Sequence, residues 1–235
     1  MGDRVTTPDT AEEPVPLVSF ARIAVSPPPL RELLAVQADG TAMAWRSNGP
    51  AVGRFRGRVE SIEDLRAAVD GAAVAEGLGE GPLELVPDAA WEEVAAGGRT
   101  ARFAADDNVD GPWGALRDRC RTLLDAVSQS PTAAIVVLVD AEGHVRLEHR
   151  GDGTLPLELG SLQVALTLWR DGREAAKGAG GTSAGRVEAG PGWSLDIPNA
   201  SIDLDGGGQL VAVASFIAED EGVFVPVAST AITQV

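Results

Sequence analysis

The sequence contains very little cysteine, and this excludes one class of protein. Cys120 is the only cysteine among 235 residues, so the chain cannot form an intramolecular disulfide bond. Small secreted domains that depend on disulfide bonds are therefore excluded. The start of the chain lacks the basic and apolar regions of a secretory signal peptide. No apolar run approaches the roughly 20 residues that a membrane-spanning helix requires. We therefore expect a cytoplasmic protein with no membrane partner.

Basic residues are also scarce. The chain carries 19 basic and 35 acidic side chains, which gives a formal net charge of −16. Such a chain repels the phosphates of nucleic acids and of anionic lipids, so we expect neither as a partner. Lys177 is the only lysine. The dominance of arginine, with abundant alanine and glycine, is typical of a GC-rich bacterial genome.

The sequence has none of the common catalytic motifs. It contains no G-x-S-x-G elbow and no phosphate-binding loop, and the glycine-rich stretch at 178–185 is not G-x-G-x-x-G. We interpret that stretch as a flexible loop between strands and a candidate binding tip. His144 and His149 are five residues apart on one predicted strand, so they point to opposite faces. Cys120 lies on the apolar stripe of a predicted helix. We therefore expect that the protein is not an enzyme and binds no cofactor.

The first half of the chain predicts a compact α+β module over residues 17–130, after a disordered tail at 1–16. Apolar and polar residues alternate over 18–26, as in a half-buried strand. Residues 31–49 predict a hairpin, with apolar runs on either side of Asp39-Gly40, a pair that suits a tight turn, and a third strand follows at 51–59. Helical periodicity begins after Ser61 and again at Pro112. Two short strands on either side of Gly97-Gly98 separate the helices. The predicted order is β-β-β-α-β-β-α.

The second half, residues 131–235, predicts an all-β antiparallel sandwich. Short apolar runs alternate with turn signals such as Asp171-Gly172 and Glu221-Gly222 at roughly ten-residue spacing, without a helical stretch.

Three arginines alternate with apolar or small residues in the strand AVGRFRGRV. Arg54, Arg56 and Arg58 should share one face of the strand, with Phe55 on the other. In an acidic protein this stripe could bind an acidic protein segment, a phosphate or a carboxylate. The alternative is a solvated or edge face that discourages aggregation. We name these three residues as the candidate partner-binding site.

The segment DDNVDG resembles the opening of an EF-hand calcium loop. Asp106, Asn108 and Asp110 occupy its first three ligand positions, and Gly111 occupies the turn. The twelfth position, which should be a bidentate glutamate, is Arg117 instead. We therefore favour a strand-to-helix turn in which Asp110 or Gly111 caps the helix. A weak calcium site at these three residues is the alternative.

Four segments of the first half follow one another in an informative order: GTAMAWRSNGPAVGRFRGRV, SIEDLRAAVDGA, AAWEEVAAGGRTARFAADD and GPWGALRDRCRTLLDAV. Over residues 31–128 this order resembles emfourin-type modules, which inhibit bacterial thermolysin-like metalloproteases. Trp91 falls on the aromatic strand position of that family, but the resemblance assigns no inhibitory residue. The layout of residues 131–235 resembles bacterial immunoglobulin-like accessory domains.

These observations favour a non-catalytic accessory protein that binds another protein, with an inhibitory or regulatory role, in a bacterial multi-protein system. Two alternatives remain open from the sequence. One is a calcium- or small-ligand-binding protein that uses the loop at 106–111. The other is a structural subunit of an assembly.

Overall fold

The predicted periodicities correspond to regular elements in the computed structural model, which describes residues 15–24, 30–75, 90–105, 107–182, 184–198 and 200–235. The first half contains these elements: β1 (Val18–Ala24), β2 (Leu30–Val36), β3 (Thr41–Arg46), β4 (Asn48–Gly49), β5 (Ala51–Arg58), α1 (Ile62–Val74), β6 (Trp91–Ala96), β7 (Arg99–Ala104) and α2 (Pro112–Val127). Four long strands and the short β4 therefore precede α1, where the predicted layout has three strands. The hairpin predicted over residues 31–49 is confirmed, because β2 and β3 pair antiparallel on either side of Asp39-Gly40. It contributes two strands, whereas the predicted order counts it once.

The second half is built from strands alone in its described part. They are β8 (Pro131–Val139), β9 (Val145–Arg150), β10 (Leu155–Arg170), β11 (Arg173–Gly181), β12 (Arg186–Ala189), β13 (Ser194–Asp196), β14 (Gln209–Asp220) and β15 (Val223–Gln234). The described part of the chain is thus mostly antiparallel β-structure with two helices. Most of the tail predicted to be disordered, residues 1–14, lies outside the described residues.

Strands from both halves form one continuous sheet of nine strands, in the order β13-β9-β8-β5-β3-β2-β1-β6-β7. The junction is the antiparallel pairing of β5 with β8, which joins the two parts that the sequence divided after residue 130. Gly53 permits the close approach at this junction, because its φ is +130° and a Cβ there would lie 2.3 Å from the Ala133 carbonyl oxygen. A second sheet has the order β11-β10-β14-β15-β4, with β12 also pairing with β10.

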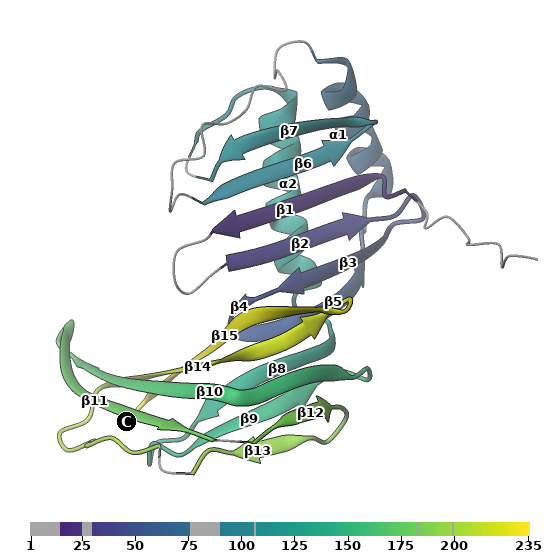
Figure 1. Ribbon diagram of the computed structural model, residues 1–235. Coiled ribbons are helices and arrows are strands. Elements are labelled where there is room, and N and C mark those ends of the chain that lie inside the picture. The colour runs from purple at the N-terminus through teal and green to yellow at the C-terminus, as the bar shows by residue number, and fades with distance from the viewer. Residues whose placement is uncertain (1–14, 25–29, 76–89, 106, 183, 199) are drawn as a thin grey trace, which may run out of the picture.

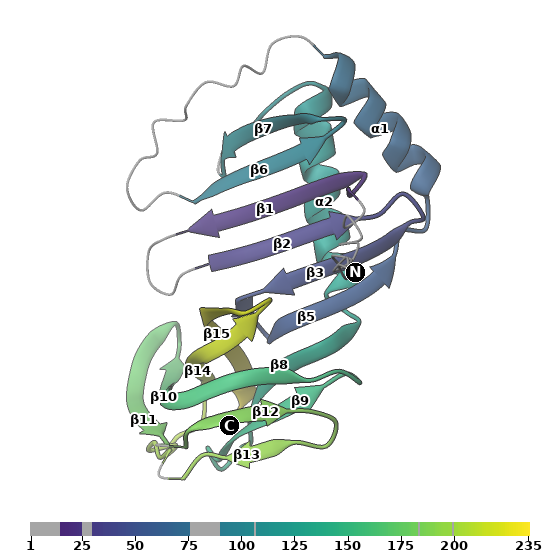
Figure 2. The same cartoon turned by 45° about the vertical axis from the view of Figure 1, so that its right-hand side comes forward.

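The two faces of the nine-stranded sheet are covered by different elements. Figure 1 shows β7 to β5 stacked in front of α2, and the β14–β15 hairpin lying across the lower end of this stack. One apolar core fills the space between this sheet and the helices, with Phe20, Leu65 and Leu116 buried in it. A second core lies between the two sheets, and it includes Trp45 and Val52 from the first half. The predicted sandwich is therefore present, but one of its layers belongs to the nine-stranded sheet (Figure 2).

Hydrogen bonds also connect the second sheet to the first half. The β4 strand pairs in parallel with β15 at Ala228 and Ser229. The hydroxyl of Ser229, which is fully buried, accepts a hydrogen bond from the Val137 amide at 2.9 Å and donates one to the Pro50 carbonyl oxygen at 3.2 Å. These bonds fix the position of the β14–β15 hairpin relative to β5 and β8.

The glycine-rich stretch at 178–185 is not a simple loop, because Gly178 to Gly181 lie in β11. A Cβ on Gly178 would lie 2.0 Å from the Ser201 carbonyl oxygen, and one on Gly180 would lie 2.7 Å from the Ala200 Cα. The small residues are needed because the chain at Ala200 and Ser201 crosses β11 at very short range. The interpretation of this stretch as a flexible loop is therefore wrong for its first four residues.

Among the described residues, no helix is both long enough and apolar enough to cross a membrane.

Candidate functional site: a groove on the open sheet face

The face of the nine-stranded sheet opposite the helices is open over β1, β2 and β3. Side chains alternate between the two faces, so residues between the core positions form this surface. Leu33 pairs with Ala21 on one side and with Trp45 on the other, while Ala35 pairs with Met43. These five side chains form the floor of a groove of about 570 Å³. The floor is apolar and partly exposed to solvent, and Met43 is 47% exposed.

The tip of the β14–β15 hairpin forms one wall of the groove. Asp220 and Glu221 line it, and Glu221 adopts a positive φ of 49° in the turn. The Asp220 carboxylate lies 3.8 Å from the Arg31 guanidinium and 3.6 Å from that of Arg54. Burial raises the pKa of Asp220, although the charge of Arg31 opposes this shift. The ion pairs hold the hairpin tip against the sheet face.

The three arginines predicted to bind a partner have different surroundings. Arg54 donates a hydrogen bond to the Glu219 carbonyl oxygen at 3.2 Å and also pairs with Asp220. Its side chain therefore holds the hairpin that forms the groove wall. Arg58 donates to the Asp39 carbonyl oxygen at 3.3 Å and lies outside the groove. Arg56 lines the groove beside Met43, and its exposed side chain has no ion pair or hydrogen bond to any described residue. Only Arg56 of the three offers a free cation to a ligand in the groove.

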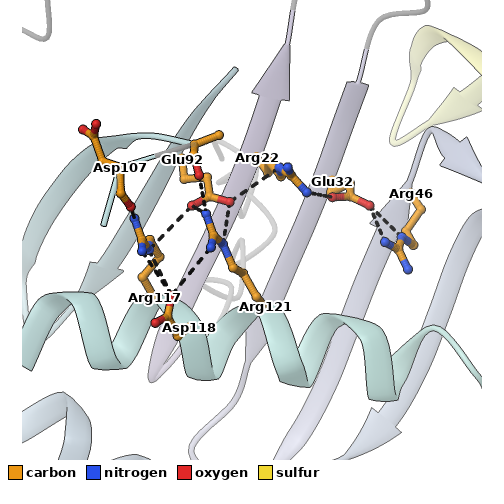
Figure 3. A network of polar contacts seen from close by, with 9 residues as sticks. Arg22, Glu32, Arg46, Glu92, Asp107, Arg117, Asp118 and Arg121 are labelled. Carbon is orange, nitrogen blue, oxygen red and sulfur yellow. Dashed lines mark hydrogen bonds and ion pairs between the residues drawn. The ribbon is translucent and has the colours of Figure 1, made fainter. Parts of the chain in front are cut away.

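A network of buried charges lies on the other face of the same strands (Figure 3). Glu92 on β6 is fully buried and accepts two hydrogen bonds from Arg121 on α2, at 2.8 and 2.6 Å. Arg22 and Arg117 also approach this carboxylate, at 3.5 and 3.8 Å. The arrangement is charge-assisted and fork-like, which fixes α2 on the sheet with defined geometry.

The network continues across the neighbouring strands. Glu32 on β2 is 3% exposed, and its carboxylate lies 2.6 Å from Arg46 and 3.7 Å from Arg22. Four arginines thus surround two buried glutamates, and Asp118 and Asp125 pair with the same arginines at the surface. Because the four arginines balance the charges of the two glutamates and two aspartates, we assign this network a structural role. It went unnoticed in the sequence, although its signal is there: charged residues at strand positions that alternation assigns to the core.

The loop predicted as a cap or a calcium site precedes α2. Gly111 is the N-cap residue and Pro112 the first helical residue, so the predicted helix start is confirmed. Asn108 and Asp110 are exposed, whereas Asp106 lies outside the described residues. The guanidinium of Arg117 is buried and donates a hydrogen bond to the Asp107 carbonyl oxygen at 2.8 Å. A fixed positive charge that binds this loop opposes the binding of a cation there.

Cys120 and the two histidines do not have the surroundings of a functional site. Cys120 is fully buried, and burial raises the pKa of its thiol to about 12, so it remains protonated at neutral pH. His149 lies in β9 and is buried, whereas His144 precedes that strand in the β8–β9 turn and is exposed, so the two histidines do not share one strand as predicted.

An exposed cluster in the β8–β9 turn was not predicted. Asp140, Glu142 and His144 bring ligand atoms within 4.8 Å of one another, and His144 Nδ1 lies 3.0 Å from the Asp140 carboxylate. Neighbouring members of this cluster are two positions apart in the sequence. Their side chains meet because the chain makes a tight turn there.

Comparison of the chain with protein-family models, with curated proteins and with solved structures gave no match. The assignment of a function therefore depends on the geometry of the groove.

Proposed function

We propose that this chain is a non-catalytic protein-binding protein and that its partner docks in the groove on the open sheet face. The observation that carries the proposal is the exposure of Met43 and its apolar neighbours beside the unpaired Arg56. Contiguous exposed apolar surface with a polar rim is typical of protein interaction sites. Methionine and arginine are also enriched in the centres of such interfaces.

The charges around the groove define the chemistry of the partner. Arg31 and Arg54 neutralise Asp220 from within the chain, and Arg102 pairs with Glu93. This leaves Arg56 and Glu221 as the charged groups available beside the apolar floor. The partner should therefore present an apolar segment with a carboxylate placed against Arg56 and away from Glu221. The resemblance of residues 31–128 to emfourin-type modules would make this partner a bacterial metalloprotease and the role inhibitory.

Affinity capture with groove variants tests this proposal. Tagged full-length protein is used to capture partners from the lysate of the native organism, in parallel with Met43→Glu and Arg56→Glu. We expect the wild-type chain to retain one partner in stoichiometric amount and both variants to lose it, because each places a charge against the segment that docks there.

The matched controls are Ile232→Glu and Arg173→Glu. Ile232 is 61% exposed at the opposite end of β15 from the hairpin tip, and Arg173 is an exposed arginine without a described partner at the start of β11. Both controls should capture the partner as the wild type does. A partner that all five proteins retain equally would place binding outside the groove and contradict the proposal.

A further inference from the structure

A second pocket, of about 520 Å³, lies at the end of the β14–β15 hairpin that is opposite to the groove. Its lining comes from the β10–β11 turn, from the loop before β14 and from the start of β14 and the end of β15. The strand β14 begins at Gln209 in this pocket and ends at Asp220 in the groove wall, so about 35 Å of strand separates the two sites. The pocket is therefore independent of the groove.

An exposed tryptophan and two glutamines form a row on the outer face of the second sheet. Trp169 on β10 pairs with Gln209 on β14, and Gln209 pairs with Gln234 on β15. The neighbours Leu168 and Leu210 are buried between the two sheets, so alternation turns the row away from the core. At 39%, Trp169 is the most exposed of the five tryptophans. An indole ring that is not buried in a core is available to a ligand.

Two turns form the walls beside this row and are bonded to each other. One is the β10–β11 turn at Asp171-Gly172, and the other is the loop at 206–208. The Nε of Arg170 donates a hydrogen bond to the Gly207 carbonyl oxygen at 2.6 Å, and a Cβ on Gly206 would lie 3.3 Å from the guanidinium carbon of Arg170. The guanidinium thus packs against the loop and holds the two turns together, so the pocket is formed before a ligand enters.

The polar side chains of the pocket are available for hydrogen bonds. Asp171, Gln209 and Gln234 form no side-chain hydrogen bond or ion pair to any described residue. Each glutamine amide can both donate and accept. Arg170 and Asp171, the charged residues of the lining, carry opposite charges. The pocket therefore suits an uncharged ligand that offers hydrogen-bond donors and acceptors together with an apolar surface.

We propose that this pocket binds a neutral oligosaccharide. A pyranose ring has C–H groups on its faces and hydroxyl groups around its edge. The indole of Trp169 provides a flat apolar surface for the C–H groups, while Asp171 and the two glutamines exchange hydrogen bonds with the hydroxyl groups. The row crosses three adjacent strands, a span of about 10 Å, so it contacts more than one sugar unit. This activity is additional to the proposed function.

Titration with defined oligosaccharides, followed by NMR, tests the proposal. In the isotope-labelled full-length chain each of the five tryptophans gives one indole N–H signal, and Trp169→Phe identifies the signal of Trp169. The probes are cellotetraose, xylotetraose, maltotetraose and tetra-N-acetylchitotetraose at millimolar concentration. We expect at least one of them to shift the signal of Trp169 and to leave those of the buried Trp45 and Trp113 unchanged.

Variants of the pocket are then compared by the saturation transferred from the protein to the bound sugar. Trp169→Ala should weaken binding about tenfold or more, as expected for an aromatic anchor, and its four remaining indole signals verify the fold. Gln209→Ala should weaken it about threefold to tenfold through the lost hydrogen bond. The matched control is Phe224→Ala, because Phe224 is 47% exposed at the other end of β15. It should bind as the wild type does.

Three results would overturn the inference. The first is that no oligosaccharide shifts the signal of Trp169. The second is that Trp169→Ala and Gln209→Ala bind the sugar as well as Phe224→Ala does. The third is a shift caused by inorganic phosphate and by none of the sugars, because Arg170 and the loop at 206–208 would then form an anion site. These measurements need no partner protein, so their failure can be distinguished from failure of the proposed function.

Discussion

At the scale of single residues, Glu92 contributes most to the attachment of α2 to the sheet. It is fully buried, and its two hydrogen bonds from Arg121 accompany the nearby charge of Arg117, which is itself 3% exposed. Removal of one partner from a buried ion pair leaves an uncompensated charge in the protein interior. We expect Glu92→Gln to lower the free energy of unfolding by about 3 kcal/mol in chemical denaturation.

The adjacent Glu93 supplies the matched control. It points to the opposite face and pairs with Arg102 at 2.6 Å, in surroundings where both side chains are exposed enough for solvent to screen the charges. Glu93→Gln should cost less than about 1 kcal/mol. Equal losses in the two variants would show that the buried network does not stabilise the fold.

The burial of His149 should make the stability of the fold depend on pH. Its side chain is buried, neither ring nitrogen has a hydrogen-bond partner among the described residues, and burial lowers its pKa below the usual 6.5. The unfolded chain therefore takes up a proton at a higher pH than the folded chain does. The contribution of His149 to stability is present above pH 6.5 and is lost as the pH falls through its lower folded-state pKa.

Replacement of the two histidines separates this effect from the titration of carboxylates. Between pH 7 and pH 5, we expect the melting temperature of His149→Leu to fall less than that of the wild type. His144→Gln, at an exposed position, should follow the wild type. A steeper fall for His149→Leu would contradict the assignment.

At the scale of elements, replacing two glycines in helices by alanine should have opposite effects on stability. Gly71 in α1 has open space where a Cβ would lie, so Gly71→Ala should raise stability by about 1 kcal/mol through helix propensity. In α2, a Cβ on Gly114 would lie 1.8 Å from the Val109 carbonyl oxygen. Gly114→Ala should therefore lower the melting temperature, because the loop before α2 must move. Stabilisation by both alanines would show that the loop does not pack on the helix.

The sequence predicted most elements because their signals are local. Alternation identified β1, β2, β3 and β5, and the apolar stripe of α2 runs through Trp113, Cys120 and Val127 to the buried face. The stretch at 178–181 was not recognised as a strand, since glycine has low strand propensity and the requirement for it comes from the distant residues Ala200 and Ser201. Contacts between residues far apart in the sequence leave no such local pattern.

At the scale of the whole molecule, the nine-stranded sheet makes the two halves depend on each other. The β5–β8 pairing and the burial of Trp45 and Val52 between the sheets would both be lost in separate fragments. We expect the full chain to unfold in one cooperative thermal transition and the fragment 131–235 to show none. A dispersed NMR spectrum from that fragment alone would mean that the second half folds independently.

The groove could not be predicted from the sequence, because it depends on contacts between residues far apart in the chain. The alternation in β5 correctly placed Arg54, Arg56 and Arg58 opposite Phe55. It could not distinguish the arginine without a partner from the two that bind within the chain, because the Glu219 carbonyl oxygen that engages Arg54 lies 165 residues away. Which part of the sheet face stays open depends on where the β14–β15 hairpin crosses it.

Binding of the partner in the groove can be measured by titrating the purified captured partner against three full-length proteins. Isothermal titration calorimetry would give Kd for the wild type, Met43→Glu and Ile232→Glu. We expect a Kd at least about tenfold weaker for Met43→Glu, as for a residue central to an interface, and a change within about twofold for Ile232→Glu. Equal affinities of the wild type and Met43→Glu would contradict binding in the groove.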